Sequence, residues 1–289
     1  MPAQCPRRYY RSVRLPRSIA SYRLAATLLA TTLLLAWVAR RHHDVSIASL
    51  PALPAAFVQR VPTRVVWAWE EPEDLRSLPP SVGVAYLAET DLLTNGIAVL
   101  PRRQPLMPAQ DAPLVAVVRI ETRPGFVDSP MLRAALATHL AAVAAARPAL
   151  RAFQIDFDAT ASQRAFYRGV LEELRPRLPA SLPLSITALV SWCGPGSWLH
   201  RLPVDEAVPM EFRMGGPRRL AQLSHRPVPI TEALCRTSLG LSTDEPWPAP
   251  ATLQPATRLY LFAPRPWQPA ALAAFATQPL AILAQELSR

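Results

Sequence analysis

The sequence predicts an α/β fold: a (β/α)8, TIM-like barrel with irregular crossovers, following an N-terminal membrane segment. From Thr63 onward, apolar runs of β-forming residues alternate with helical stretches, which favours a parallel sheet with helical connections. Eight such runs fall within residues 62–289, and eight strands in about 250 residues are typical of this barrel. Half of the 289 residues are apolar and 18% are charged, so the chain can bury a full core.

Residues 1–43 are a basic leader with a hydrophobic segment. Residues 1–41 hold eight Arg and no acidic residue, and residues 24–39 carry no charge. A helix over residues 24–39 would rise about 24 Å, a little less than the roughly 30 Å of a bilayer core. Two alternatives remain open, a signal anchor that holds the domain in the periplasm at the inner membrane and a cleaved secretory signal. Both place the domain in the cell envelope or outside the cell.

The rest of the chain divides into a Pro/Ala linker, residues 44–61, and a single domain, residues 62–289. Beyond residue 41 the formal charge of +10 shrinks to 23 Arg against 21 acidic residues, which argues against a nucleic-acid-binding surface spread over the domain. The sequence has no GxSxG, Walker or GxGxxG motif and no Cys/His spacing typical of zinc. We therefore expect no nucleic-acid partner, no cofactor and no metal.

The elements of the domain follow in order. Strands are predicted at residues 63–69, 81–88, 113–121, 152–158, 183–191, 206–213, 234–242 and 257–263, and helices at residues 129–146, 162–178 and 268–276. Ser129 and Pro130 suit the start of the first helix, and Ser162 is the expected cap of the second. The TNG sequence after the second strand predicts a hairpin in place of a crossover helix. The helices after strands five to seven are short and broken by Pro, so a doubly wound sheet is the alternative fold.

The strand at residues 152–158 carries the main candidate site. Alternation directs its Phe and Ile side chains toward the helices and Gln154, Asp156 and Asp158 toward the barrel interior. The two carboxylates lie near the carboxyl end of the strand, where barrel active sites form. The open alternative is a pair of structural ion pairs with Arg119 and Arg213.

Further acidic residues, arginines and tryptophans fall on or just after other strand ends. This pattern suits a carbohydrate site, in which one carboxyl group protonates the leaving oxygen and another carboxylate activates water or attacks. The candidate catalytic residues are Asp158, Asp156, Glu121 and Glu211. The candidate substrate-binding residues are Trp69, Glu71, Arg119, Trp192, Arg213 and Asp244.

Cysteine and histidine are scarce in the domain. Cys193 and Cys235 are an even pair in an oxidising compartment, and the two alternatives for them are a disulfide and two buried thiols. His139 falls on the first predicted helix, and we interpret it as a surface or core residue.

Several strings resemble a bacterial domain family of unknown function found in proteobacterial envelope proteins, over roughly residues 62–268. Among them are VVWAWEEPEDLRSL, FQIDFDATASQRAFYRGVLEELRPRLP and LPVDEAVPMEFRMG. The resemblance implies no activity. The segment QIDFDAT is also similar to the fourth-strand signature DGxDxDxE of chitinase-like glycosidases, glycoside hydrolase family eighteen. Asp156 and Asp158 match its last two aspartates, whereas Thr160 stands at the glutamate that would be the general acid, so the chitinase mechanism does not carry over.

These observations predict an envelope-anchored, glycosidase-like barrel that acts on a cell-envelope or extracellular polysaccharide. The alternative is a non-catalytic barrel module that binds a glycan or a protein, so whether the domain is an enzyme stays open. A metal-dependent ester or amide hydrolase is a third interpretation, against which histidine is scarce near the strand ends. We expect contact with the membrane through residues 24–39, and the oligomeric state is not predicted.

Overall fold

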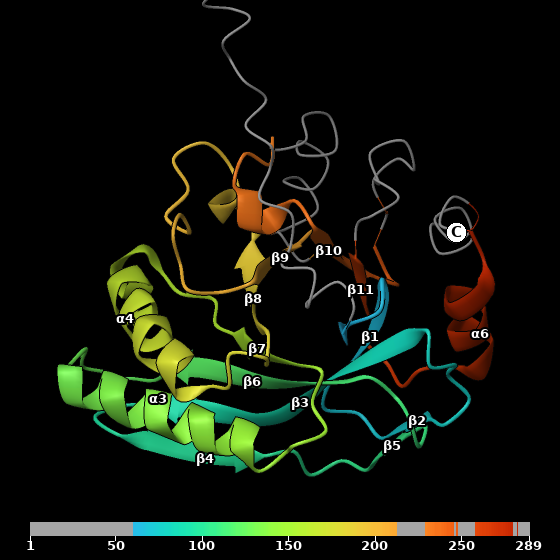
Figure 1. Ribbon diagram of the computed structural model, residues 1–289, viewed down its shortest axis with the longest axis horizontal. Helices are drawn as coiled ribbons and strands as arrows, with labels where there is room; N and C mark the ends of the chain where they lie inside the picture. Colours follow the sequence, from blue (N-terminus) through green and yellow to red (C-terminus); the bar gives the residue numbers. More distant parts are fainter. Residues whose placement is uncertain (1–59, 213–228, 246, 248–257, 280–281, 283–289) are drawn as a thin grey trace, which may run out of the picture. The chain divides into compact units, whose positions relative to one another are not determined.

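The computed structural model describes residues 60–212, 229–245, 247, 258–279 and 282 (Figure 1). The predicted leader and nearly all of the linker therefore lie outside the described residues. Within the described part of the chain, no helix has the length and apolar character needed to cross a membrane. The hydrophobic segment at residues 24–39 stays a prediction.

Eight parallel strands close into a barrel, which confirms the predicted fold class. Strand β1 pairs with β3 on one side and with β11 on the other, and these two pairings close the sheet into a ring. A doubly wound sheet, the alternative fold, would have two free edges instead. The barrel strands are β1 (Arg64–Ala68), β3 (Val82–Leu93), β6 (Leu114–Thr122), β7 (Ala152–Asp156), β8 (Leu184–Leu189), β9 (Glu206–Met210), β10 (Ser238–Ser242) and β11 (Arg258–Phe262).

Strand β3 is longer than the predicted second strand and continues into a hairpin. β4 (Ile97–Pro101) pairs with it in antiparallel orientation after a short turn, as the TNG sequence predicts. A bulge between Leu87 and Glu89 shifts the register of β3 against β6. Two further short strands, β2 (Glu73–Leu75) and β5 (Leu106–Pro108), form a separate parallel pair.

The described helices follow three of the barrel strands. They are α3 (Pro130–Ala145) after β6, α4 (Arg164–Leu174) after β7 and α6 (Pro269–Thr277) after β11. The Ser129 hydroxyl accepts a hydrogen bond from the backbone N–H of Leu132 at 3.1 Å, so the predicted cap is confirmed.

The cap expected at Ser162 is wrong, because Ser162 lies inside the 3-10 turn η1 (Ala161–Gln163), which begins after Thr160. The other described 3-10 turns are η2 (Arg175–Arg177), η3 (Val190–Trp192) and η4 (Ala233–Cys235). Short turns thus replace helices in the described connections near β8 and β10, where the sequence is rich in Pro.

Side chains on the two faces of the strands belong to different cores. Phe153 and Ile155 of β7 pack outward with Phe166 of α4, whereas Trp67 and Tyr260 pack inside the barrel. The two rings stack at 5.1 Å between centroids. The alternation predicted along residues 152–158 is therefore confirmed for β7.

A buried hydrogen-bond network fills the amino-terminal end of the barrel. Glu206, which is fully buried, accepts hydrogen bonds from Ser185 Oγ at 3.0 Å and from the Tyr260 hydroxyl at 2.9 Å, and it pairs with the Arg258 guanidinium. Gln154 donates to Ser185 Oγ at 3.0 Å. Because each buried polar group has a partner, the network stabilises the barrel without the penalty of an unpaired charge.

The structure joins Cys193 and Cys235, which are 42 residues apart in the sequence, in a disulfide. The bond links the segment after β8 to the turn η4, which lies just before β10. It therefore ties together two connections that carry no α-helix among the described residues.

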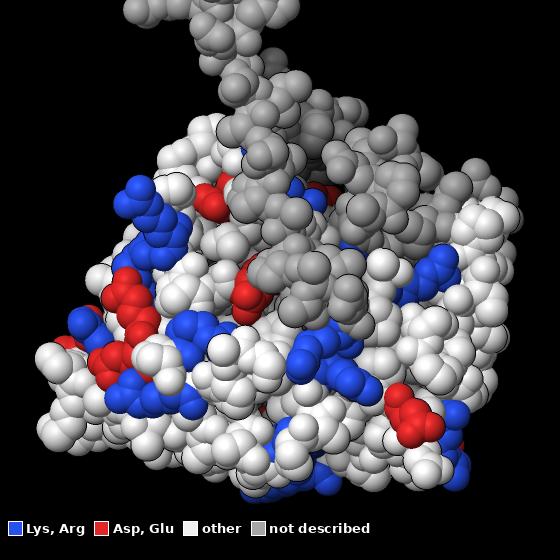
Figure 2. Space-filling view, viewed as in Figure 1, with Lys and Arg blue, Asp and Glu red and all other residues white. Residues whose placement is uncertain are grey.

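Arginine and acidic side chains are interspersed on the face of the molecule shown in Figure 2. Exposed ion pairs, such as Arg76 with Asp74 at 2.7 Å, also occur among the described residues. Such exposed pairs each contribute little to stability.

Candidate functional site

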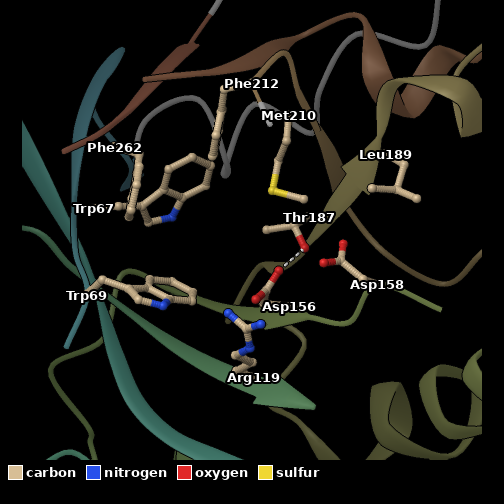
Figure 3. A pocket seen from close by; sticks show the side chains of 10 residues that line it. All are labelled: Trp67, Trp69, Arg119, Asp156, Asp158, Thr187, Leu189, Met210, Phe212 and Phe262. Carbon is tan, nitrogen blue, oxygen red and sulfur yellow. Dashed lines mark hydrogen bonds between the residues drawn. The ribbon is translucent and has the colours of Figure 1, made fainter. Parts of the chain in front are cut away.

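A pocket of about 230 Å³ opens at the carboxyl ends of the barrel strands (Figure 3). Side chains on or just after β1, β6, β7, β8, β9 and β11 line it. They are Trp67, Trp69, Arg119, Asp156, Asp158, Thr187, Leu189, Met210, Phe212 and Phe262. This end of a (β/α)8 barrel is the one on which barrel enzymes carry their active sites.

Two carboxyl groups face this pocket. Asp156 is the last residue of β7 and is only 6% exposed, and Thr187 Oγ1 donates a hydrogen bond to its Oδ1 at 2.6 Å. Burial raises the pKa of Asp156 to about 6, although the Thr187 bond opposes the rise. Asp158 is more exposed, and partial desolvation raises its pKa while Arg119 lowers it. A carboxyl group that titrates near pH 6 can exchange a proton under mildly acidic conditions.

Arg119 is the cationic side chain among the described residues that line the pocket. Its guanidinium lies 6.0 Å from the centroid of the Trp69 ring and points toward Asp156 (Figure 3). Its ion-pair partner is Glu121, two residues further along β6, at 2.9 Å from Nε to Oε1. Among the described residues neither Asp156 nor Asp158 forms an ion pair within 4.0 Å, so the alternative of a structural pair with Arg119 does not hold.

A second cavity of about 220 Å³ adjoins the first and shares Arg119, Asp156 and Asp158 with it. Glu121 and Thr160 also line this second cavity. The structure therefore brings three of the four candidate catalytic residues, Asp156, Asp158 and Glu121, around one opening.

Aromatic rings form one wall of the pocket. Phe212 and Phe262 stack in parallel at 5.5 Å between centroids, and Trp69 meets Phe262 edge-on at 6.4 Å. Trp67 is held by a hydrogen bond from its Nε1 to Gln154 Oε1 at 3.0 Å. Flat apolar rings beside carboxylates suit the two faces of a sugar, which has apolar C–H groups and polar hydroxyl groups.

Sequence reasoning missed several lining residues. Thr187, Met210, Phe212 and Phe262 were not among the candidates, because apolar residues and threonine at strand ends resemble ordinary core residues. The available signal is alternation. Residues that lie level with each other on neighbouring strands point to the same side of the sheet, so a lining residue on one strand identifies one on the next. Thr187 could have been found in this way from Asp156.

Glu211, the fourth candidate catalytic residue, does not line either cavity. Its neighbours Met210 and Phe212 line the pocket, and alternation turns the residue between them away from it. Glu211 is half-buried, and burial raises the pKa of its carboxyl group.

The remaining candidates also lie outside the two cavities. Trp192 is a core residue that packs edge-on against Trp198 at 5.1 Å, so it offers no surface to a ligand. Glu71 and Asp244 are exposed and line neither cavity. Arg213 lies outside the described residues.

Fold and pocket together define a closed (β/α)8 barrel with carboxylates, an arginine and aromatic rings at the carboxyl ends of its strands. A family model described as a domain of unknown function (DUF3142) matches residues 110–208, which include Arg119, Asp156, Asp158 and Thr187. The predicted resemblance to an uncharacterised domain family is confirmed for this segment. The resemblance to glycoside hydrolase family eighteen stays a prediction.

Comparison with curated proteins finds no match. Among solved structures, the crystal structure of the Bacillus cereus spore cortex-lytic enzyme SleL is similar, with 15% identity and a TM-score of 0.40. The similar region covers 62% of this chain and 51% of the SleL chain, so this chain spans about half the length of that protein. At this level the similarity carries no conclusion about function.

Proposed function

We propose that this protein is a glycosidase-like barrel that binds and cleaves a polysaccharide of the cell envelope or the extracellular space. The observation that carries the proposal is the pair Asp156 and Asp158 in an open pocket, beside Arg119 and a wall of aromatic rings. Carboxyl groups in such a setting perform the acid and base steps of glycosidic cleavage.

The geometry supports different roles for the carboxyl groups. Asp158 is exposed at the opening, so we assign it the proton transfer with the glycosidic oxygen. Asp156 lies deeper, bound by Thr187, and tunes the charge next to Asp158. Glu121, held between Arg119 and Arg123, is the second carboxylate that activates water or attacks the sugar. The aromatic wall, with Trp69 at its edge, binds the faces of the sugar rings.

The proposed cellular location follows from the leader. Eight arginines without an acidic residue precede and flank the apolar segment at residues 24–39, which favours insertion with the basic end inside. The domain then faces the periplasm from the inner membrane or is secreted after cleavage. Both compartments contain polysaccharides, which are the proposed partners of the domain.

The direct test measures reducing ends released by the full-length protein from a panel of envelope and extracellular polysaccharides. We expect turnover on at least one of them, and a loss of about 100-fold or more in Asp158→Asn, as is typical when a general acid is removed. Asp244→Asn is the matched control, because Asp244 is an exposed acid outside both cavities. Absence of turnover on the whole panel, or full activity of Asp158→Asn, would contradict the proposal.

One observation favours a second function, a non-catalytic module that binds a glycan or a partner protein. Thr160 lines the second cavity where the resemblance to chitinase-like enzymes would require a glutamate, and threonine is not a useful acid. A binding module would retain its affinity for the glycan in Asp158→Asn and show no turnover. Calorimetric titration of both proteins with the same oligosaccharide, together with the release of reducing ends by the unmodified protein, separates the two functions.

A further inference from the structure

A cluster of two carboxylates and an imidazole lies between β3 and α3. Glu89 and Asp91 are on β3, and His139 reaches them from α3. His139 Nε2 is 2.6 Å from Glu89 Oε1 and 3.4 Å from Asp91 Oδ1, and one ligand atom from each of the three residues lies within 4.8 Å of the others.

An ordinary ion pair does not explain the buried carboxylate of Asp91. Its side chain is 0% exposed, and no hydrogen bond from the described residues reaches either carboxylate oxygen. A buried carboxylate without hydrogen bonds is costly, and a second carboxylate next to it, that of Glu89, adds repulsion. Among the described residues, the His139 imidazole is the basic group that lies within ion-pair distance of both carboxylates. The cluster therefore holds two carboxylates beside one imidazole, and the imidazole cannot balance the negative charge of both.

We propose that Glu89, Asp91 and His139 bind a divalent transition-metal ion, and that zinc is the best match. Zinc accepts imidazole nitrogen and carboxylate oxygen together and prefers four ligands in a tetrahedron. With bonds of about 2.1 Å, two ligand atoms of a zinc tetrahedron lie about 3.4 Å apart. The distance from His139 to Asp91 already has this value, and Glu89 would move away from His139 by under about 1 Å. The His139 side chain is 29% exposed, which leaves a path for the ion and a water as fourth ligand.

The site is separate from the candidate active site. None of the three residues lines either cavity, and Asp91 pairs in register with Ile120, which belongs to the outer core beneath the helices and also borders the second cavity. The ion thus lies on the helix side of the barrel wall, where it joins the extended part of β3 to α3. We infer a structural role for it.

Sequence reasoning expected no metal because it searched for closely spaced Cys and His. His139 lies 50 residues from Glu89 in the chain, and the fold alone brings them together. The bulge in β3 just before Glu89 shifts the register on this part of the strand.

The test uses the full-length protein after chelation and dialysis, titrated with zinc by calorimetry and heated with and without the ion. We expect one zinc per chain at this site. At a free zinc concentration 100 times the dissociation constant, the unfolding equilibrium constant should fall about 100-fold, which raises Tm by roughly 5 to 10 °C for a domain of this size. Asp91→Asn and His139→Gln should each weaken binding by at least about 100-fold.

Three controls make the outcome decisive. His200→Gln, an exposed histidine outside the cluster, should bind zinc like the unmodified protein. A protein with His42→Ala and His43→Ala should also keep the site, which separates it from weak binding by that adjacent pair. Magnesium should not reproduce the effect, because it does not favour imidazole.

The proposal is overturned by absence of zinc binding, by equal binding in Asp91→Asn and His139→Gln, by an equal response to magnesium, or by loss of binding in the His42 and His43 variant. His139 is partly exposed, so its variant keeps the test valid if Asp91→Asn does not fold.

Discussion

Replacing Asp156 by asparagine should stabilise the folded protein at neutral pH while it impairs the site. Asp156 is almost fully buried, and its ionised form is disfavoured there, because burial raises its pKa to about 6. Asparagine has nearly the same shape, carries no charge and can still accept the hydrogen bond that Thr187 donates. The substitution therefore removes the ionisation and keeps the packing.

The magnitude follows from the difference between the ordinary pKa of 3.8 and the value of about 6. One pKa unit corresponds to about 1.4 kcal/mol, so ionising Asp156 in the folded state costs about 3 kcal/mol more than in the unfolded state. Because the pKa is raised on folding, the protonated carboxyl group favours the folded state below about pH 4. This contribution is lost as the pH rises through about 6.

The assay is urea unfolding of the unmodified protein and of Asp156→Asn between pH 4 and pH 8. We expect similar free energies of unfolding near pH 4 and an advantage of about 3 kcal/mol for the variant at pH 8. The other ionisable groups are common to the two proteins, so the comparison isolates the effect of the substitution at residue 156. Asp244→Asn should follow the unmodified protein at every pH. A constant difference between the two curves from pH 4 to pH 8 would refute the reasoning.

Three further predictions concern other parts of the barrel. Trp69→Ala should weaken the binding of an oligosaccharide, measured by calorimetry, by about tenfold, since a stacked ring contributes about 1.4 kcal/mol. Unchanged affinity would show that Trp69 does not contact the sugar. Replacing Cys193 and Cys235 by serine should lower the free energy of unfolding, measured in urea, by about 4 kcal/mol. This is the chain entropy that a disulfide closing a loop of 42 residues removes from the unfolded state, and an equally stable variant would contradict it. Glu206→Gln should cost about 3 to 5 kcal/mol because it removes the carboxylate that pairs with the buried Arg258 guanidinium. A thermal melt like that of the unmodified protein would exclude this role.

The barrel strands were predictable because burial on both faces leaves long apolar runs in the sequence. Each of the eight predicted strands overlaps a barrel strand, and the hairpin after the second strand was marked by its TNG turn. Closure of the sheet was not evident in any single segment. It depends on the pairing of β1 with β11, which joins opposite ends of the domain.

The candidate site was predictable where alternation was regular and ended at a polar residue. Asp156, the last residue of β7, and Asp158, two residues beyond it, satisfied both conditions. Glu211 lies outside the cavities because it comes just after β9, and the side chains on either side of it face the pocket. Trp192 also lies outside them, since nearness to a strand end does not distinguish a residue at an opening from one in a 3-10 turn within the core.

The pairing of β1 with β11, which closes the barrel, also sets the order in which the chain can fold as it is synthesised. Arg258, at the start of β11, donates a hydrogen bond to the carbonyl of Pro62, 196 residues earlier, and fixes the seam next to β1. At about 5 to 20 residues per second, a ribosome needs roughly 10 to 40 s to make the stretch between them. During that time β1 lacks one of its two neighbours. A nascent chain with an open strand edge is prone to pair with other chains, so a factor that shields this edge until residue 262 has emerged should raise the yield of folded protein.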